Sequence, residues 1–354
     1  MEKHQSDILR QFKLNGNAVS CEPYGTGHIN DTYLVVTDTG VRYILQRLNT
    51  NVFKEPLVVM NNIEKVTAHL GKKCKDPREV LHLVYTTDDK CYLEDETGFY
   101  RVYDFVEDSV CVLRPTKSDF EQCAVAFGKF QYDLSDFPAE ELVETIPDFH
   151  NTPKRFKDFE KAVEEDIVGR AATAQEEIAF IKEREPFTHV LMDAHKEGRL
   201  PLRVSHNDTK SDNVMLDAET HKALCVIDLD TIMPGFAVTD FGDSIRFGAS
   251  TALEDEPDLN KVHLDMDLYN TYIKGFLAGN KGSMEPGEIE LLAEGAKMMT
   301  LECGMRFLAD YLQGDTYFKT AYPEHNLVRA RTQIKLVKEM EEHWDEMKEA
   351  AHNA

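Results

Sequence analysis

The sequence predicts an α+β protein of two lobes, a small β-rich lobe followed by a larger α-rich one. Two observations lead to this prediction. Over roughly the first hundred residues, apolar and polar side chains alternate as they do in strands, and glycines separate the alternating runs. From about Phe120 onward, apolar residues recur at three- and four-residue spacing, which is typical of amphipathic helices. We therefore expect lobes at residues 1–106 and 107–354, with a functional site in the crevice between them.

The expected elements of the two lobes follow in chain order. Strands of the first lobe are expected at residues 32–36, 42–48 and 100–106. A helix between them is expected to begin at Pro56, a residue type favoured in the first turn, and to end at Gly71. In the second lobe we expect one strand-like segment, at residues 214–227. We expect helices at residues 120–130 and 178–181, and a long amphipathic one at residues 327–347.

Composition excludes several classes of protein. The 354 residues include 64 acidic and 40 basic side chains, which gives a formal net charge of −24. A nucleic-acid-binding protein needs a basic face, and this chain has no surplus of cations to form one. The hydrophobic fraction of 42% is that of a globular protein, so the charge does not indicate disorder.

The cysteines and the apolar runs indicate a protein of a reducing compartment. The seven cysteines are far apart and include no C-x-x-C pair, so we expect free thiols without zinc or redox chemistry. Residues 1–7 lack the apolar core of a signal peptide, and no apolar run approaches the ~18 residues of a membrane span. We expect a cytoplasmic protein that binds neither a membrane nor nucleic acid and has no obligate protein partner.

One segment of the second lobe concentrates polar side chains. Residues 206–213 precede two short apolar runs around a polar turn, a pattern that indicates a β-hairpin. Folding this hairpin about its middle places Asn213 opposite Asp228, with Asp208 in the loop just before. The spacing thus gathers the oxygen atoms of Asp208, Asn213, Asp228 and Asp230, and such hard ligands suit Mg²⁺.

This cluster has the layout of a phosphoryl-transfer loop, H-x-D-x-x-x-x-N, followed by a metal-binding aspartate. It resembles the kinase-like fold in its aminoglycoside-phosphotransferase form, in which the second motif is D-x-D or D-x-E. The resemblance implies that Asp208 accepts the proton of the acceptor hydroxyl, while Asn213 and Asp228 hold Mg²⁺ against the phosphates of ATP. Asp230 is expected to be a second metal ligand or to support the first, and Lys210 to reach the γ-phosphate.

A second aspartate motif lies nearby. The sequence D-F-G begins at Asp240, 27 residues after Asn213, whereas Asp228 follows Asn213 after 15 residues, at the mouth of the hairpin. We therefore assign the metal to Asp228. Asp240 or Asp243 is expected to be a helix N-cap or a structural hydrogen-bonding residue.

The first lobe is expected to supply the contacts to the nucleotide. A glycine-containing turn lets backbone N–H groups approach phosphates, and its candidate residues are Gly25, Thr26, Gly27, Asn30 and Thr32. In protein kinases a strand lysine meets the phosphates and pairs with a helix glutamate. Here Gln46 stands at the lysine position and Arg47 points to the other face of the strand, so Gln46, or Arg47 by a different route, must meet the phosphates. Glu64 is either the helix partner or an exposed glutamate.

Six segments of the chain resemble the N-acetylhexosamine 1-kinase family over about residues 20–340, and they are 24–30, 43–47, 206–210, 227–235, 240–250 and 304–311. The resemblance implies transfer of phosphate from ATP, with Mg²⁺, to the anomeric hydroxyl of N-acetylglucosamine or N-acetylgalactosamine. A glutamine in place of the strand lysine is also a trait of that family. The implied sugar contacts come from His28, Asp208 and Arg306, with Phe247 and Tyr24 packing near the ring or the acetyl group.

Several alternatives stay open at this point. Arg306 lies between Glu302 and Asp310 at four-residue steps, so an intrahelical ion pair would also explain it. A kinase of an aminoglycoside, of choline or of homoserine would share the same fold. The missing strand lysine would suit a non-catalytic nucleotide-binding module, and the carboxylates alone would suit a metal-dependent hydrolase. The favoured mechanism is direct in-line transfer with Asp208 as base and no phospho-enzyme.

Overall fold

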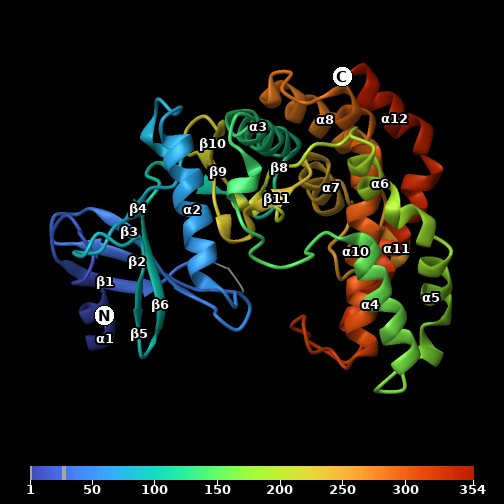
Figure 1. Ribbon diagram of the computed structural model, residues 1–354, viewed down its shortest axis with the longest axis horizontal. Coiled ribbons are helices and arrows are strands. Elements are labelled where there is room, and N and C mark those ends of the chain that lie inside the picture. The colour runs from blue at the N-terminus through green and yellow to red at the C-terminus, as the bar shows by residue number, and fades with distance from the viewer. Residues whose placement is uncertain (1, 26–28) are drawn as a thin grey trace.

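The N-terminal lobe is built on an antiparallel sheet of six strands (Figure 1). In the computed structural model, which describes residues 2–25 and 29–354, the order is β1-β2-β3-β6-β4, and β5 also pairs with β6. The strands are β1 (Ala18–Pro23), β2 (Asp31–Thr37), β3 (Arg42–Leu48), β4 (Leu83–Val84), β5 (Leu93–Asp95) and β6 (Gly98–Asp104), and helix α1 (Lys3–Leu9) precedes them. The predicted strands correspond to β2, β3 and β6.

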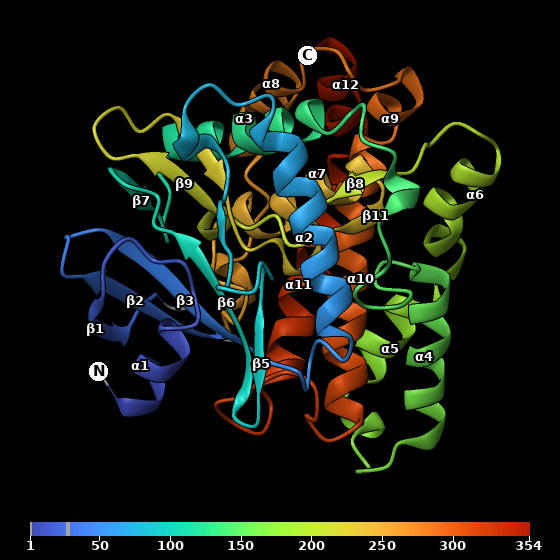
Figure 2. The ribbon, with the colours of Figure 1, turned by 60° about the vertical axis from the view of Figure 1, so that its left-hand side comes forward.

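Helix α2 (Pro56–Gly71) has the bounds that the sequence predicts, and it joins the two lobes. It lies between the sheet and the second lobe (Figures 1 and 2). Its buried face, which includes Met60 and Ile63, packs in one core with Phe99 of β6 and with Ile232 of the second lobe. Asn62, fully buried, donates from Nδ2 to the carbonyl oxygen of Ile232 at 2.9 Å. The two lobes therefore share a hydrophobic core beside the crevice.

The second lobe is mainly helical, as expected. Its helices are α3 (Lys117–Asp133), α4 (Thr152–Glu165), α5 (Gln175–Lys182), α6 (Val190–Lys196), α7 (Ala237–Gly248), α8 (Met266–Asn280), α9 (Pro286–Glu290), α10 (Leu292–Leu312), α11 (His325–Glu342) and α12 (Trp344–Asn353). The predicted single helix at residues 327–347 is wrong, because the chain turns at His343. Helix α11 contributes Val337 to the core of α4, α5 and α10, and Leu336 and Met340 to the core around α3, α7 and α8. Met347 of α12 enters the second of these cores.

Two small sheets carry the loops that face the first lobe. Strands β9 (Val214–Asp217) and β10 (Ala223–Val226) form the predicted hairpin, and β7 (Ser109–Cys111) pairs with β9. Strand β8 (Arg203–Ser205) pairs with β11 (Met233–Gly235). The predicted hairpin register is wrong by one residue: a register shift between Ala223 and Cys225 places Ile227, whose N–H donates to the carbonyl oxygen of Asn213 at 2.9 Å, opposite Asn213. Asp228 is therefore the first residue beyond the hairpin.

Within residues 2–25 and 29–354, no helix combines the length and the apolar character needed to cross a bilayer.

Candidate active site

The loop 206–213 is held rigidly by the strands and helix around it. His206 is fully buried, and its Nε2 lies 2.8 Å from the carbonyl oxygen of Ile227, so its ring ties the loop to the end of the hairpin. Asn207 adopts a left-handed conformation with φ of 64°, and its Nδ2 donates to the carbonyl oxygen of Thr231 at 2.9 Å. This turn brings Asp208 to the half-exposed surface that faces the crevice.

Helix α7 supplies the acceptors that fix this loop. Both oxygens of Asp240 accept backbone N–H groups of the loop, from His206 at 2.9 Å and from Asn207 at 2.8 Å. Asp243 accepts the N–H of Thr209 at 3.1 Å. The prediction that Asp240 and Asp243 are structural hydrogen-bonding residues is confirmed, although the N-cap position of α7 belongs to Phe236. Asp240 and Asp243 are buried, so these residues hold the backbone of the loop on its side away from solvent.

Asp208 is flanked by a cation and an amide. Lys210 Nζ lies 3.1 Å from Asp208 Oδ2, and Asn213 Nδ2 donates to the same oxygen at 3.0 Å. Burial lowers the pKa of Lys210, but the attraction of Asp208 and Asp212 outweighs burial and the pKa lies above its usual value. A charged Lys210 in this position can stabilise the carboxylate of Asp208 and contact a phosphate.

Asp228 is a carboxylate at the end of the hairpin that lies close to two other carboxylates, Asp208 and Asp230. It adopts a left-handed conformation with φ of 58°, and its side chain is exposed to solvent although protein mass surrounds it, as at the floor of a cleft. Burial, followed by repulsion from Asp230 and Asp208, raises its pKa to about 7. None of the residues that the structure describes donates a hydrogen bond to this carboxylate or to Oδ1 of Asn213.

These two oxygen donors fit a magnesium ion. Mg²⁺ keeps several waters and takes one or two carboxylates together with substrate phosphates, so an incomplete set of protein ligands is what it requires. Among the described parts of the chain, no group of three or more His, Cys, Asp or Glu side chains forms a closed metal site. Asn213 and Asp228 would hold the ion, which would neutralise charge on the phosphates when bound.

Asp230, expected at the metal, serves another purpose. Its Oδ1 lies 2.5 Å from Nη1 of Arg101, and its Oδ2 accepts from Nδ2 of Asn30 at 2.6 Å. The ion pair is short but its N–H is not aligned as a hydrogen bond. Because both oxygens have protein partners, a direct metal contact of Asp230 is disfavoured, and it is left with the supporting role.

Arg101 is a residue of the site that sequence reasoning missed. It is the largest fully buried side chain, with 1% of its surface exposed, and it stands directly opposite Gln46 on the neighbouring strand. Its Nε and Nη2 donate to Oε1 of Gln46 at 2.9 and 2.8 Å. Gln46 in turn donates from Nε2 to Oγ1 of Thr32 at 3.1 Å. In the sequence Arg101 is visible only as a basic residue within a strand. Its partner Gln46 can be identified only from the register of the sheet.

The candidate residues of the glycine turn are placed in part. Thr26, Gly27 and His28 lie outside the described residues. Gly25 has a φ of 77°, which favours glycine, and Asn30 accepts the N–H of Asn49 at 2.9 Å while it donates to Asp230. Asn30 therefore attaches the turn to the second lobe.

Two candidates for phosphate contacts lie elsewhere. Arg47 is exposed and donates to the carbonyl oxygen of Thr97 at 2.6 Å, on the face of the sheet away from Gln46. Glu64 accepts the hydroxyl of Tyr85 at 2.7 Å and is not bonded to Gln46 or Arg47. Glu64 is therefore not the partner of the strand residue, while a contact of Arg47 with the phosphates stays a prediction.

Two arginines of the second lobe, Arg155 on α4 and Arg306 on α10, lie beside Phe149. The guanidinium of Arg306, on α10, lies 5.2 Å from the ring centroid of Phe149 and 5.6 Å from that of Tyr317. Arg155 donates from Nε to the carbonyl oxygen of Phe149 at 3.1 Å. Burial and then repulsion from Arg306 lower the pKa of Arg155. Within the described residues, neither arginine has a carboxylate oxygen within 4.0 Å.

The helix neighbours of Arg306 are occupied by other groups. Glu302 accepts from Nδ1 of His150 at 2.8 Å and from Thr152 at 2.5 Å. Asp310 accepts three backbone N–H groups of residues 316–318 and Nδ2 of Asn326. The alternative of an intrahelical ion pair for Arg306 is therefore wrong.

The two aromatic candidates lie on different elements. Phe247 is 38% exposed on α7, one residue after Arg246. Tyr24 is 43% exposed and packs edge-on against Phe105, in the connection that follows β6, with ring centroids 6.0 Å apart. The contact of Tyr24 is therefore with the link between the lobes.

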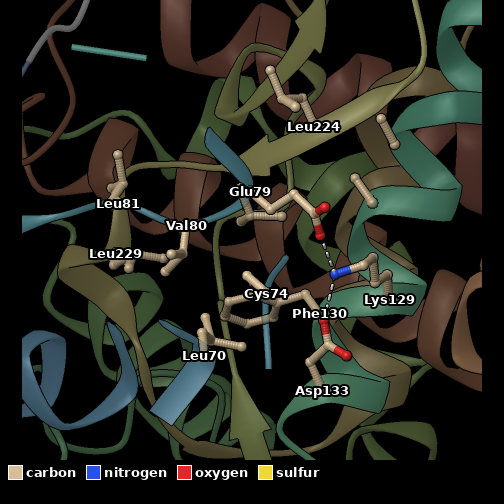
Figure 3. Close-up of a pocket in the computed structure, with 13 residues that line it drawn as sticks. Leu70, Cys74, Glu79, Val80, Leu81, Lys129, Phe130, Asp133, Leu224 and Leu229 are labelled. Atoms are coloured by element: carbon tan, nitrogen blue, oxygen red, sulfur yellow. Dashed lines mark hydrogen bonds and ion pairs between the residues drawn. The ribbon is translucent and has the colours of Figure 1, made fainter. Parts of the chain in front are cut away.

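A separate pocket lies between the C-terminal end of α2, helix α3 and strand β10 (Figure 3). Leu70 and Cys74 line it together with Leu224 of β10, and Lys129 bridges Glu79 at 3.1 Å and Asp133 at 2.7 Å across it. Its volume of ≈30 Å³ is about that of one water molecule. This pocket is too small for a nucleotide and lies apart from Asp208.

The lobes, the hairpin and the loop define a two-lobed, kinase-like small-molecule phosphotransferase. The model of the phosphotransferase enzyme family matches residues 20–270, and the chain belongs to this family. Its fold is that of the aminoglycoside phosphotransferases and protein kinases, as predicted, and the family makes it an ATP-dependent kinase of a small molecule.

Solved structures share this fold at low sequence identity. An aminoglycoside phosphotransferase from Alicyclobacillus acidocaldarius has a TM-score of 0.65 and 12% identity, over 98% of this chain and 96% of that chain. A choline kinase from Cryptosporidium parvum has a TM-score of 0.62 and 13% identity, over 99% and 98% of the two chains. An amicoumacin kinase in complex with AMP-PNP and Ca²⁺ has a TM-score of 0.57 and 13% identity, over 91% and 88%.

Proposed function

We propose that this protein is an N-acetylhexosamine 1-kinase, which transfers the γ-phosphate of ATP to the anomeric hydroxyl of N-acetylglucosamine or N-acetylgalactosamine. The observation that carries the choice of acceptor is the pair of unpaired arginines, Arg155 and Arg306, beside Phe149. Among the described residues, both arginines lack a carboxylate oxygen within 4.0 Å, and Glu302, which attracts both, is hydrogen-bonded to His150 and Thr152. The two cations therefore disfavour a positively charged acceptor. They favour an acceptor whose hydroxyl and carbonyl oxygens accept hydrogen bonds, as those of an N-acetylated sugar do.

In the proposed mechanism Asp208 orients the anomeric hydroxyl and accepts its proton. Lys210 limits the build-up of negative charge beside it and contacts the transferred phosphate, while Asn213 and Asp228 hold Mg²⁺. The ion supplies charge neutralisation for the phosphates. Transfer is direct and in line, so catalysis consists mainly of positioning and electrostatic stabilisation.

The nucleotide-binding proposal extends into the first lobe. We assign Gly25, Thr26 and Gly27 to backbone contacts with the phosphates. Thr32, on the adjoining strand β2, is assigned to the same nucleotide-binding site. Arg306 and His28 are assigned to the sugar, and Phe247 to packing against its ring. Tyr24 lies beside the link between the lobes, so its place near the sugar has less support than the others.

A kinase of an amine-bearing acceptor is the second candidate. It is favoured by the solved structures, because those with this fold include an aminoglycoside phosphotransferase and a choline kinase. Such an acceptor would need carboxylates near its amine, whereas the acceptor position that we propose lies beside Arg155 and Arg306. The two candidates therefore differ in the charge of the acceptor.

Phosphorus NMR of reactions with ATP, Mg²⁺ and one acceptor at a time decides between them. N-acetylglucosamine, N-acetylgalactosamine, galactose, kanamycin and choline form the panel, and we expect an anomeric phosphate from the two N-acetylhexosamines. Replacing Arg306 by Gln should raise the KM for the sugar about tenfold or more, with the KM for ATP unchanged, because a donor to the sugar is lost. Phosphorylation of kanamycin or choline, with none of the hexosamines, would overturn the proposal.

A further inference from the structure

Arg101 joins the two lobes through a desolvated ion pair. It lies on β6 of the first lobe, while Asp230 lies in the turn Leu229–Thr231 of the second lobe, directly after the metal candidate Asp228. Their side chains are 1% and 4% exposed. Breaking such a pair leaves an unpaired buried charge, which is costly. The position of the turn that carries Asp228 therefore depends on a cation of the opposite lobe.

The same guanidinium also fixes the strand residue that stands in place of the kinase lysine. Arg101 bonds Oε1 of Gln46 twice, which leaves the amide nitrogen of Gln46 to face Thr32. The planar guanidinium presents its N–H groups in a rigid fork, so one side chain can hold Gln46 and Asp230 at once. A lysine at position 101 could supply the charge but not this fork.

We propose that Arg101 replaces the strand lysine of the kinase fold, as a positioning residue for nucleotide binding. It acts through Asp230, which sets the turn carrying Asp228, and through Gln46, which faces the glycine turn. The positive charge of Arg101 also offsets the negative charge of Asp230, which lies two residues after Asp228. The phosphates of a metal–nucleotide complex therefore meet less repulsion at the site. Because Arg101 is buried, it does this without direct contact with the phosphates. The inference rests on the nucleotide-binding part of the proposed function and is independent of the acceptor.

The test moves the cation from one strand to the other. Gln46 and Arg101 are directly opposite on antiparallel strands, so the double variant Gln46→Lys/Arg101→Gln keeps one amide and one cation in the pair and places a lysine at the usual position. It is compared with the parent, with Arg101→Gln and with Arg101→Lys. Binding of ADP with Mg²⁺ is measured by titration calorimetry without acceptor, after circular dichroism has established folding. Failure of the sugar assay therefore leaves this measurement intact.

We expect Arg101→Gln to weaken MgADP binding roughly tenfold or more, Arg101→Lys to weaken it less, and the double variant to recover most of the loss. The KM for the acceptor should stay unchanged in all three, which a general loss of structure would not allow. A folded Arg101→Gln variant with the affinity of the parent, or a folded double variant that binds no better than Arg101→Gln, would overturn the proposal. Failure of all three variants to fold would also overturn it, in favour of a purely structural role.

Discussion

Asp208 is a carboxylate that two neighbouring side chains hold in place. Lys210 and Asn213 both contact its Oδ2, so the other oxygen is left for the acceptor hydroxyl. Replacing Asp208 by Asn keeps the shape but removes the ability to accept a proton. We expect turnover to fall roughly 10²–10⁴-fold, while the affinity for MgADP changes little because Asn213 and Asp228 remain. An ATP-consumption assay and titration calorimetry measure the two quantities.

The matched control is Asp88→Asn, an exposed aspartate of the first lobe remote from the loop. It makes the same chemical change and should leave both turnover and affinity as they are. Full turnover in Asp208→Asn would remove Asp208 from the role of base. Loss of MgADP affinity equal to the loss of turnover would instead indicate a role in binding the nucleotide.

Which residues of the site could be predicted depends on how far apart they lie in the chain. Asp208, Asn213 and Asp228 belong to one loop and one hairpin, so local spacing brings them together. Arg101 and Gln46 are 55 residues apart, and only the register of β3 and β6 shows that they face each other. Likewise, Arg155 and Arg306 lie on separate helices, so their proximity appears only in the folded lobe.

Helix α7 is fixed at its crossing with α10 by glycines on both sides. A Cβ at Gly242 would lie 2.2 Å from the carbonyl oxygen of Gly295, with backbone that cannot move aside. We expect Gly242→Ala to destabilise the protein by about 1–3 kcal/mol or more, and to lower turnover as well. The second effect follows because α7 carries Asp240 and Asp243, which hold the loop of Asp208. Differential scanning calorimetry and the kinase assay measure the two effects.

Gly71 provides the control for this substitution. It is the last residue of α2, and a Cβ there would have no neighbouring atom within 4 Å. Gly71→Ala should therefore be neutral, or stabilising by up to ~1 kcal/mol because the unfolded chain loses freedom. If Gly242→Ala proved as stable as Gly71→Ala, the close contact of α7 and α10 would not be a determinant of stability.

Elements were predictable where the chain carries its own start and stop signals. Helix α2 begins at Pro56 and ends at Gly71 as expected, since both residues act locally. The C-terminal helix has no such signal at His343, and the helical spacing of Val337, Met340, Trp344 and Met347 continues across the break. The hairpin register depends on an irregularity between Ala223 and Cys225 that alternation of apolar residues does not encode.

The two lobes are connected by the core around α2 and by the pair Arg101–Asp230. A nucleotide held by the glycine turn and by the Mg²⁺ ligands of the hairpin would contact both lobes. It would therefore bind the folded protein and not the unfolded chain. A ligand of this kind stabilises by mass action, by about 2.7 kcal/mol at a hundred times its Kd. We expect MgADP to raise the melting temperature. Excess EDTA should remove most of the rise, because ADP alone meets the carboxylates of Asp208 and Asp228 without a neutralising ion.

The variant Asp228→Asn tests whether the rise in melting temperature with MgADP depends on this one carboxylate. In the absence of ligand this variant should melt at the temperature of the parent or above it, because Asp230 and Asp208 no longer repel a charge at that position. In the presence of MgADP it should gain much less than the parent, because a carboxylate ligand of the metal is lost. A variant that melts lower without ligand and gains as much as the parent with MgADP would show that Asp228 supports the fold and does not hold the metal. Thermal melts of both proteins with ADP, with and without Mg²⁺, give all the required values.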